Sequence, residues 1–116
     1  MLSITPERRI WLCIHPTDMR RSFDGLSAMV RSHLGDDPTN GSWFVFINRR
    51  RTQIRVLAFE DGGYCLWSKR LEQGHFAALN CVGDNKRALS CVEFMALIEG
   101  VDMVIKRRRK RYRKAA

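Results

Sequence analysis

The stretch that decides the fold is residues 43–70, which reads WFVFINRRRTQIRVLAFEDGGYCLWSKR. It contains three runs of aromatic and β-branched residues, and such runs are typical of β-strands. We expect strands at 43–48, 53–59 and 64–70, joined by an arginine-rich turn and by the Asp61-Gly62 pair. Because both connections are short, the three strands are predicted to form an antiparallel meander.

The residues before this stretch predict one short strand and one helix. We expect the strand at 10–14 and the helix at about 19–34, with Thr17 or Asp18 as its N-cap and Gly35 after its last turn. Apolar residues at helical spacing form the face that we expect to be buried against the sheet: Phe23, Leu26, Val30 and Leu34.

The residues after the three strands predict a loop and a second helix. Residues 72–88 show no clear periodicity and are expected to be a loop. Ser90 and Glu93 match a capping box, so a short helix should run to Glu99 and end at Gly100. The predicted fold class is α+β: a small antiparallel β-meander packed against one longer helix, with a short C-terminal helix and a basic disordered tail.

The distribution of charge predicts a single domain followed by this tail. The chain has 116 residues, with 21 Lys and Arg against 12 Asp and Glu, and a net charge of +9. We expect one domain at 1–105 and a tail at 106–116. The tail holds eight of the basic residues and no acid: Lys106, Arg107, Arg108, Arg109, Lys110, Arg111, Arg113 and Lys114. Such a block is typical of an arm that binds nucleic acid, while a solubilising role or contact with anionic lipid are the alternatives.

A second group of basic residues is predicted to lie at the tip of the first hairpin. Arg49, Arg50 and Arg51 occupy the turn, and Lys69 and Arg70 end the strand after next. Guanidinium groups on a rigid turn can bind phosphate oxygens, so we expect these residues and the tail to form one phosphate-binding surface. The alternative is that they are simply solvated.

Four aromatic side chains could either stack on nucleic-acid bases or belong to the core. They are Phe59, Trp43, Tyr64 and Trp67. Aromatic residues within strands are more often buried than exposed for stacking, so the core is the favoured interpretation.

The residue types that carry catalysis are poorly placed in this sequence. Asp18 and Asp24 lie six positions apart, which turns them away from a shared helix face, and the other acids fall in loops and turns. Cys13 and His15 lack a second ligand pair at zinc spacing. We therefore expect no catalytic residue, no metal site, no cofactor and no enzymatic activity, and we expect the four cysteines to be reduced.

The sequence gives no reason to expect a membrane protein. Its longest apolar run is the five residues 43–47, far short of the roughly 20 that a membrane helix needs. The N-terminus has no secretory signal pattern, so a cytoplasmic location without a membrane partner is expected.

Four segments carry a resemblance to a known family. They are 16–26 (PTDMRRSFDGL), 44–51 (FVFINRRR), 64–72 (YCLWSKRLE) and 97–102 (LIEGVD). In this order and spacing they resemble the TnpB-type accessory protein, encoded by the second open reading frame of the insertion sequence sixty-six (IS66) family of transposable elements. The resemblance implies a protein of a bacterial mobile element that assists transposition, while a separate transposase supplies the acidic catalytic site.

Two functions remain open at this point. In the first, the protein binds DNA, either element ends or target DNA, through the arginine turn and the tail. In the second, it is an adaptor that docks on the transposase of the same element and has only non-specific affinity for nucleic acid. Self-association into a homo-oligomer is a further expectation.

Overall fold

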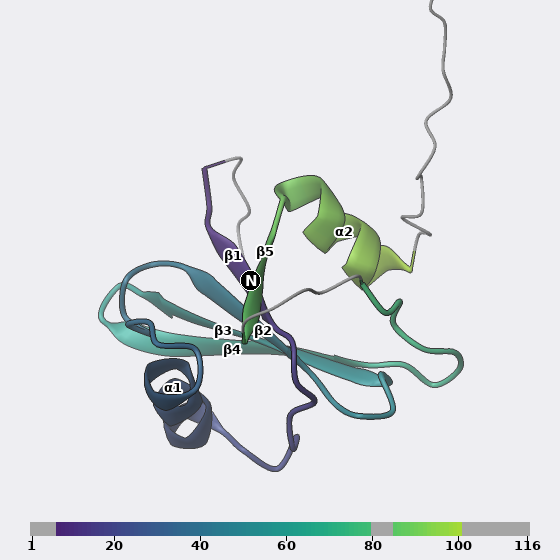
Figure 1. Ribbon diagram of the computed structural model, residues 1–116, viewed down its shortest axis with the longest axis horizontal. Coiled ribbons are helices and arrows are strands. Elements are labelled where there is room, and N and C mark those ends of the chain that lie inside the picture. The colour runs from purple at the N-terminus through teal and green to yellow at the C-terminus, as the bar shows by residue number, and fades with distance from the viewer. Residues whose placement is uncertain (1–6, 80–84, 101–116) are drawn as a thin grey trace, which may run out of the picture.

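A computed structural model describes residues 7–79 and 85–100, which form one mixed sheet and two helices (Figure 1). The elements in chain order are β1 (Ile10–Cys13), α1 (Phe23–Ser32), β2 (Trp43–Ile47), β3 (Gln53–Glu60), β4 (Gly63–Arg70), β5 (Lys86–Leu89) and α2 (Cys91–Glu99). The five strands lie in the order β4-β3-β2-β1-β5. Neither helix of this described part is long and apolar enough to cross a membrane.

The sheet is mixed, whereas the sequence predicted a small antiparallel meander. β2, β3 and β4 do pair antiparallel, as their short connections require. However, β1 pairs parallel with β2, with Ile10 opposite Trp43. The reason is that α1 connects these two strands and carries the chain back to the end of the sheet where β1 began.

The prediction of a loop over residues 72–88 was wrong for its last three residues, because β5 begins at Lys86. β5 pairs antiparallel with β1, with Ile10 opposite Leu89 and Cys13 opposite Lys86. Of its four residues only Leu89 is buried. A polar strand this short has no alternation to reveal it, and it forms because β1 offers a partner.

The two helices cover opposite faces of the sheet, with α1 below it and α2 above it in Figure 1. Because side chains alternate along a strand, β2 is buried on both faces, with Trp43 and Val45 toward α2 and Phe44 and Phe46 toward α1. The α2 side also buries Ile10, Leu12, Ile54, Val56, Ala58, Phe76, Leu89, Phe94 and Leu97. The α1 side also buries Cys13, Leu26, Val30, Leu34 and Leu57.

The helix α1 is shorter than predicted, and its buried face is narrower. It begins at Phe23 with Ser22 at the N-cap, so neither Thr17 nor Asp18 caps it. Leu26, Val30 and Leu34 are buried as expected, but Phe23 is 42% exposed. Phe23 is the first residue of α1, and its side chain is exposed, so the predicted burial of Phe23 was wrong.

The local signals for the second helix and for the β3–β4 turn are confirmed. The Ser90 hydroxyl accepts from the Glu93 amide and the Glu93 carboxylate accepts from the Ser90 amide, which is the predicted capping box. Asp61 and Gly62 both have positive φ, at 50° and 78°. The last five residues of the predicted domain and the tail at 106–116 lie outside the described residues.

Candidate nucleic-acid interface

Five of the basic residues predicted to bind phosphate lie at one end of the sheet. Arg49, Arg50 and Arg51 occupy the turn between β2 and β3. The register of β3 and β4 places Gln53 opposite Arg70 and Ile54 opposite Lys69, so the end of β4 lies beside the start of β3, next to that turn. The sequence prediction that these two groups share one end of the sheet is therefore consistent with the strand pairing.

The turn that carries the arginines is fixed by the Asn48 side chain. Its Oδ1 accepts hydrogen bonds from the amides of Thr52 and Gln53, at 2.9 and 3.0 Å. The amide of Arg51 donates to the Asn48 carbonyl at 3.0 Å, and Arg51 has a positive φ of 57°. These bonds hold the backbone of the turn rigidly, so that it presents Arg49 and Arg50 to solvent.

Three of the five predicted residues also have structural partners. Arg51 Nε donates to the Phe76 carbonyl at 3.1 Å, and Lys69 Nζ donates to the Ile98 carbonyl at 2.9 Å. Arg70 forms an exposed ion pair with Glu72 at 3.3 Å. Only Arg49 and Arg50 make no hydrogen bond or ion pair with another described residue. Among these five residues, Arg49 and Arg50 are therefore the two most available to a ligand.

Three arginines that no sequence pattern predicted lie near this turn. The Thr17 amide donates to the Ile47 carbonyl at 2.9 Å, which fixes the segment before α1 next to the end of β2. Arg55 Nη1 then donates to the Arg21 carbonyl at 2.9 Å, so β3 and that segment bring Arg55 and Arg21 together. The only signal in the sequence is the basic pair at 20–21, and nothing there indicates its neighbour on the sheet.

Arg20 is the third of these arginines, and it pairs with Asp18. Its Nη2 lies 2.7 Å from Asp18 Oδ2, and the Asp18 carboxylate also accepts from the Arg20 amide at 2.9 Å. The hydrogen bond from the Arg20 side chain, followed by that from its amide, lowers the pKa of Asp18 to about 2. Asp18 therefore stays ionised and compensates one positive charge.

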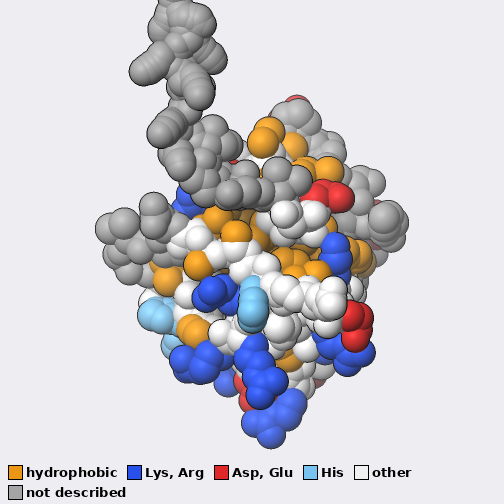
Figure 2. Space-filling view, turned by 90° about the vertical axis from the view of Figure 1, so that its right-hand side faces the viewer, with side chains coloured by type: hydrophobic (Ala, Val, Ile, Leu, Met, Phe, Trp, Pro, Cys, Tyr) orange, Lys and Arg blue, Asp and Glu red, His pale blue; other side chains and the backbone are white. Residues whose placement is uncertain are grey.

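We call this surface the arginine end. It consists of Arg20, Arg21, Arg49, Arg50, Arg51, Arg55, Lys69 and Arg70. Figure 2 views the molecule from the side on which the β2–β3 turn lies, and Lys and Arg side chains gather on its lower half beside an apolar area. Asp18 and Glu72 lie among the eight basic residues, and each is paired with one of them. The surface therefore keeps a net positive charge.

A small cleft opens at the arginine end. It has a volume of about 150 Å³ and lies between the end of β1, the β2–β3 turn and residues 77–79. Its polar lining comes from His15, Asn48, Arg49 and Arg51, and the rest is mostly apolar. Cys13 also lines it, but burial raises the pKa of its thiol, so this cysteine is not an activated nucleophile.

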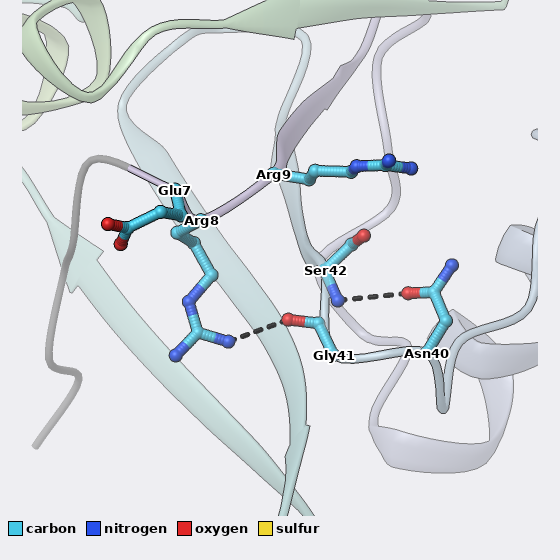
Figure 3. A pocket seen from close by; sticks show the side chains of 6 residues that line it. All are labelled: Glu7, Arg8, Arg9, Asn40, Gly41 and Ser42. Atoms are coloured by element: carbon cyan, nitrogen blue, oxygen red, sulfur yellow. Dashed lines mark hydrogen bonds between the residues drawn. The ribbon is translucent and has the colours of Figure 1, made fainter.

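A larger cleft, of about 400 Å³, lies at the opposite end of β1 and is a poor anion site (Figure 3). Arg8 lines it, but its Nη1 donates to the Gly41 carbonyl at 2.6 Å and its Nη2 lies 3.6 Å from Glu60. The same guanidinium stacks 4.9 Å from the ring centre of Trp43. Arg8 thus holds the loop before β2 on the sheet. The negative charge of the Glu7 carboxylate, which also lines the cleft, disfavours the binding of an anion there.

The aromatic residues are not arranged for stacking on bases. Trp43 is completely buried and packs against Phe94, with ring centres 5.6 Å apart, so the prediction that it belongs to the core is confirmed. Trp67 is half-buried against the same cluster. Phe59 and Tyr64 contact each other at the far end of the β3–β4 hairpin, away from the arginine end.

Within residues 7–79 and 85–100, no group of three His, Cys, Asp or Glu side chains could hold a metal ion. The described cysteines, at 13, 65 and 91, are free. The predicted binding residues of the tail lie outside the described part of the chain, so they remain predictions: Lys106, Arg107, Arg108, Arg109, Lys110, Arg111, Arg113 and Lys114.

Comparisons with known proteins place the chain among the proteins of one mobile-element family. A family model described as "IS66 Orf2 like protein" matches residues 8–108. Two relatives come from Sinorhizobium fredii (strain NBRC 101917 / NGR234). "Uncharacterized protein y4hO" is 33% identical over 94 residues, which is 81% of each chain. "Uncharacterized protein y4jC" is 38% identical over 101 residues, covering 85% of this chain and 86% of the relative. No solved structure gives a significant match.

Proposed function

Since the chain belongs to the family of IS66 Orf2 like proteins, and is thus an accessory protein associated with transposition, we propose that it binds DNA phosphates through the arginine end. The basic residues of the tail extend this contact. The bound DNA is that of the element ends or of the target site, and the separate transposase of the same element carries out the chemistry.

The observation that carries this proposal is the pair of unengaged guanidinium groups on the rigid turn. Arg49 and Arg50 are exposed and have no partner among the described residues. A guanidinium can bind two phosphate oxygens at once, and a turn fixed by the Asn48 side chain loses little conformational freedom on binding. Arg21 and Arg55 add positive charge beside it, which favours the approach of a polyanion.

A second candidate function is the adaptor, and one observation favours it. On α2 the side chains of Val92 and Met95 are 76% and 44% exposed. They lie three residues apart, so they share one face of the helix and could contact an apolar surface of the transposase. In this case the arginine end would add only non-specific affinity for DNA.

The dependence of DNA affinity on salt tests the arginine end. Each neutralised phosphate of duplex DNA changes the slope of log affinity against log salt by about 0.9. The double variant Arg49→Ala/Arg50→Ala should flatten the slope by about 1–2 units, in a fluorescence-anisotropy titration at several salt concentrations. The loss should be similar for unrelated DNA sequences, since phosphate contacts carry no sequence information.

Two controls make this test specific. Arg49→Lys/Arg50→Lys keeps both charges and should keep the slope. Arg9→Ala removes one exposed arginine before β1, at the opposite end of that strand, and should leave the slope unchanged. A slope unaffected by the double alanine variant would contradict the proposed role of the arginine end.

The contribution of the tail is tested by ending the chain after Ile105. If about half of its eight basic residues engage phosphates, the slope should flatten by roughly 3–4 units. Should this variant keep the full slope, the tail has only a solubilising role. Binding to the transposase that persists at high salt, and that Met95→Glu abolishes, would favour the adaptor.

A further inference from the structure

The strand β4 forms a long open edge of the sheet. It is the outermost strand on the side of β3, and no further strand pairs with it in the described part of the chain. It spans eight residues without a proline, and its exposed and half-buried residues are interspersed. An edge of this kind presents unpaired backbone groups to another strand.

The turn before β4 determines which of its backbone groups face outward. Asp61 and Gly62 both have positive φ, as in a type I′ hairpin turn, and they join Glu60 to Gly63. In a two-residue hairpin the flanking pair is hydrogen-bonded, and bonded and non-bonded pairs then alternate along the ladder. The residues of β4 whose N–H and C=O groups point away from β3 are therefore Tyr64, Leu66, Ser68 and Arg70.

We propose that two copies of the chain pair through β4, antiparallel, around a two-fold axis at Trp67. In this register Tyr64 lies opposite Arg70 of the second copy, and Leu66 lies opposite its Ser68. All four residues with outward-pointing backbone groups then find partners, and the two five-stranded sheets become one continuous sheet. This pairing needs no DNA, although Lys69 and Arg70 of β4 also belong to the arginine end.

The side chains of β4 favour the antiparallel arrangement. Lys69 and Arg70 lie at its C-terminal end, so a parallel pair would bring like charges together. The antiparallel pair instead places the Arg70 guanidinium beside the ring of Tyr64 from the second copy, where a cation–π contact can form. The two Trp67 side chains face each other at the axis, and these half-buried rings lose further contact with water.

The other edge of the sheet limits the assembly to two copies. That edge is β5, which has only four residues and carries Lys86 and Arg87. Pairing of β5 with β4 of another copy is therefore unfavourable, because β5 is short and both strands carry positive charge. Pairing of β4 with β4 uses the same surface on both copies, so the assembly closes as a dimer.

The mass of the protein in solution tests this pairing. Sedimentation equilibrium without nucleic acid should give twice the 13.5 kDa mass of one chain. Ser68→Pro removes an outward N–H without breaking the β3–β4 ladder, and it should reduce the mass to that of a monomer. Ser68→Thr keeps the N–H and should remain dimeric, and circular dichroism should show that both variants are folded.

The native cysteine on this edge tests the register. In the proposed dimer, exposed Cys65 lies opposite Lys69 of the second copy in a non-hydrogen-bonded pair, a spacing that suits a disulfide. Lys69→Cys should therefore form a covalent dimer when oxidised with diamide. The same substitution combined with Cys65→Ser should not, and neither should Lys69→Ala.

Two outcomes would overturn the proposal. One is a monomeric wild-type chain at concentrations up to about 100 µM, far above the dissociation constant of a stable complex. The other is a dimer that survives Ser68→Pro, which would mean that a different surface holds it. The loss of DNA affinity in the arginine variants is measured separately, so failure here leaves that test unaffected.

Discussion

The carboxylate of Glu93 has three roles at the start of α2. Its oxygens accept from the Ser90 amide at 2.9 Å and from Arg87 Nη2 at 3.0 Å, and its charge lies in the first turn of the helix. The hydrogen bond from the Ser90 amide, together with the smaller effect of Arg87, lowers the pKa of Glu93 although partial burial opposes the shift. Ionised Glu93 therefore stabilises the folded chain.

This shift predicts how stability depends on pH. A carboxyl whose pKa is lower in the folded state contributes stability above its ordinary pKa of 4.5, and this is lost as the pH falls through that value and below. The urea midpoint of the wild type should therefore decrease between about pH 5 and pH 3. Glu93→Gln should lower the midpoint at pH 7 and weaken this decrease.

The control is Glu99→Gln, which removes an exposed carboxylate from the other end of the same helix. It should leave the pH profile close to that of the wild type. A Glu93→Gln profile parallel to the wild type at every pH would contradict the assigned role of this carboxylate.

Phe23 and Leu26 offer a matched test of the face that α1 buries. Phe23 is 42% exposed and Leu26 is completely buried. Leu26→Ala should lower the free energy of unfolding by about 2–5 kcal/mol, the range for a fully buried leucine. Phe23→Ala should cost less than about 1 kcal/mol, as measured by urea denaturation. If the two substitutions cost the same, Phe23 belongs to the core after all.

At the scale of the elements, the β3–β4 hairpin depends on Asp61, which is in the left-handed region at φ 50°. A β-branched residue is strained there, so Asp61→Val should destabilise the chain by about 1–2 kcal/mol. Asp61→Gly removes the strain and should stay within about 0.5 kcal/mol of the wild type. Thermal unfolding of both variants checks this. Equal losses in the two would mean that the Asp61 side chain, rather than its backbone conformation, stabilises the turn.

The elements differ in how well the sequence predicts them, and the difference follows from where their partners lie. β2, β3 and β4 are predicted because each carries a dense apolar pattern and the next strand is only a turn away. β5 is not, because Lys86 and Arg87 give it no alternation and its partner β1 lies more than seventy residues earlier. The parallel pairing of β1 with β2 is not predicted either, because these two strands also lie far apart in the chain.

The residues of the candidate site also differ in how well the sequence predicts them. Arg49 and Arg50 are predicted from the turn alone, since a hairpin tip presents whatever it contains. Arg21 and Arg55 join them only through a hydrogen bond between segments 34 residues apart. The roles of Arg51 and Lys69 in bonding the carbonyls of Phe76 and Ile98 also depend on contacts that no local pattern reports.

At the scale of the whole molecule, the arrangement of acidic residues predicts that the isolated chain does not cut DNA. Two-metal phosphoryl transfer needs carboxylates that converge on the ions. No such cluster exists among residues 7–79 and 85–100. We expect no nicking of supercoiled plasmid with Mg²⁺ or Mn²⁺. Reproducible cleavage that Asp18→Asn or Asp24→Asn abolishes would contradict this expectation.

The position of β1 has a consequence for the synthesis of the protein. β1 leaves the ribosome before every other described element, yet the strand that covers its outer edge and the helix that covers its upper face come last, at 86–99. Until then Ile10 and Leu12 lack part of the packing that buries them. A nascent chain that stops short of this point would expose its apolar core to proteases and aggregation. The packing around β1 is therefore complete only once translation has passed α2.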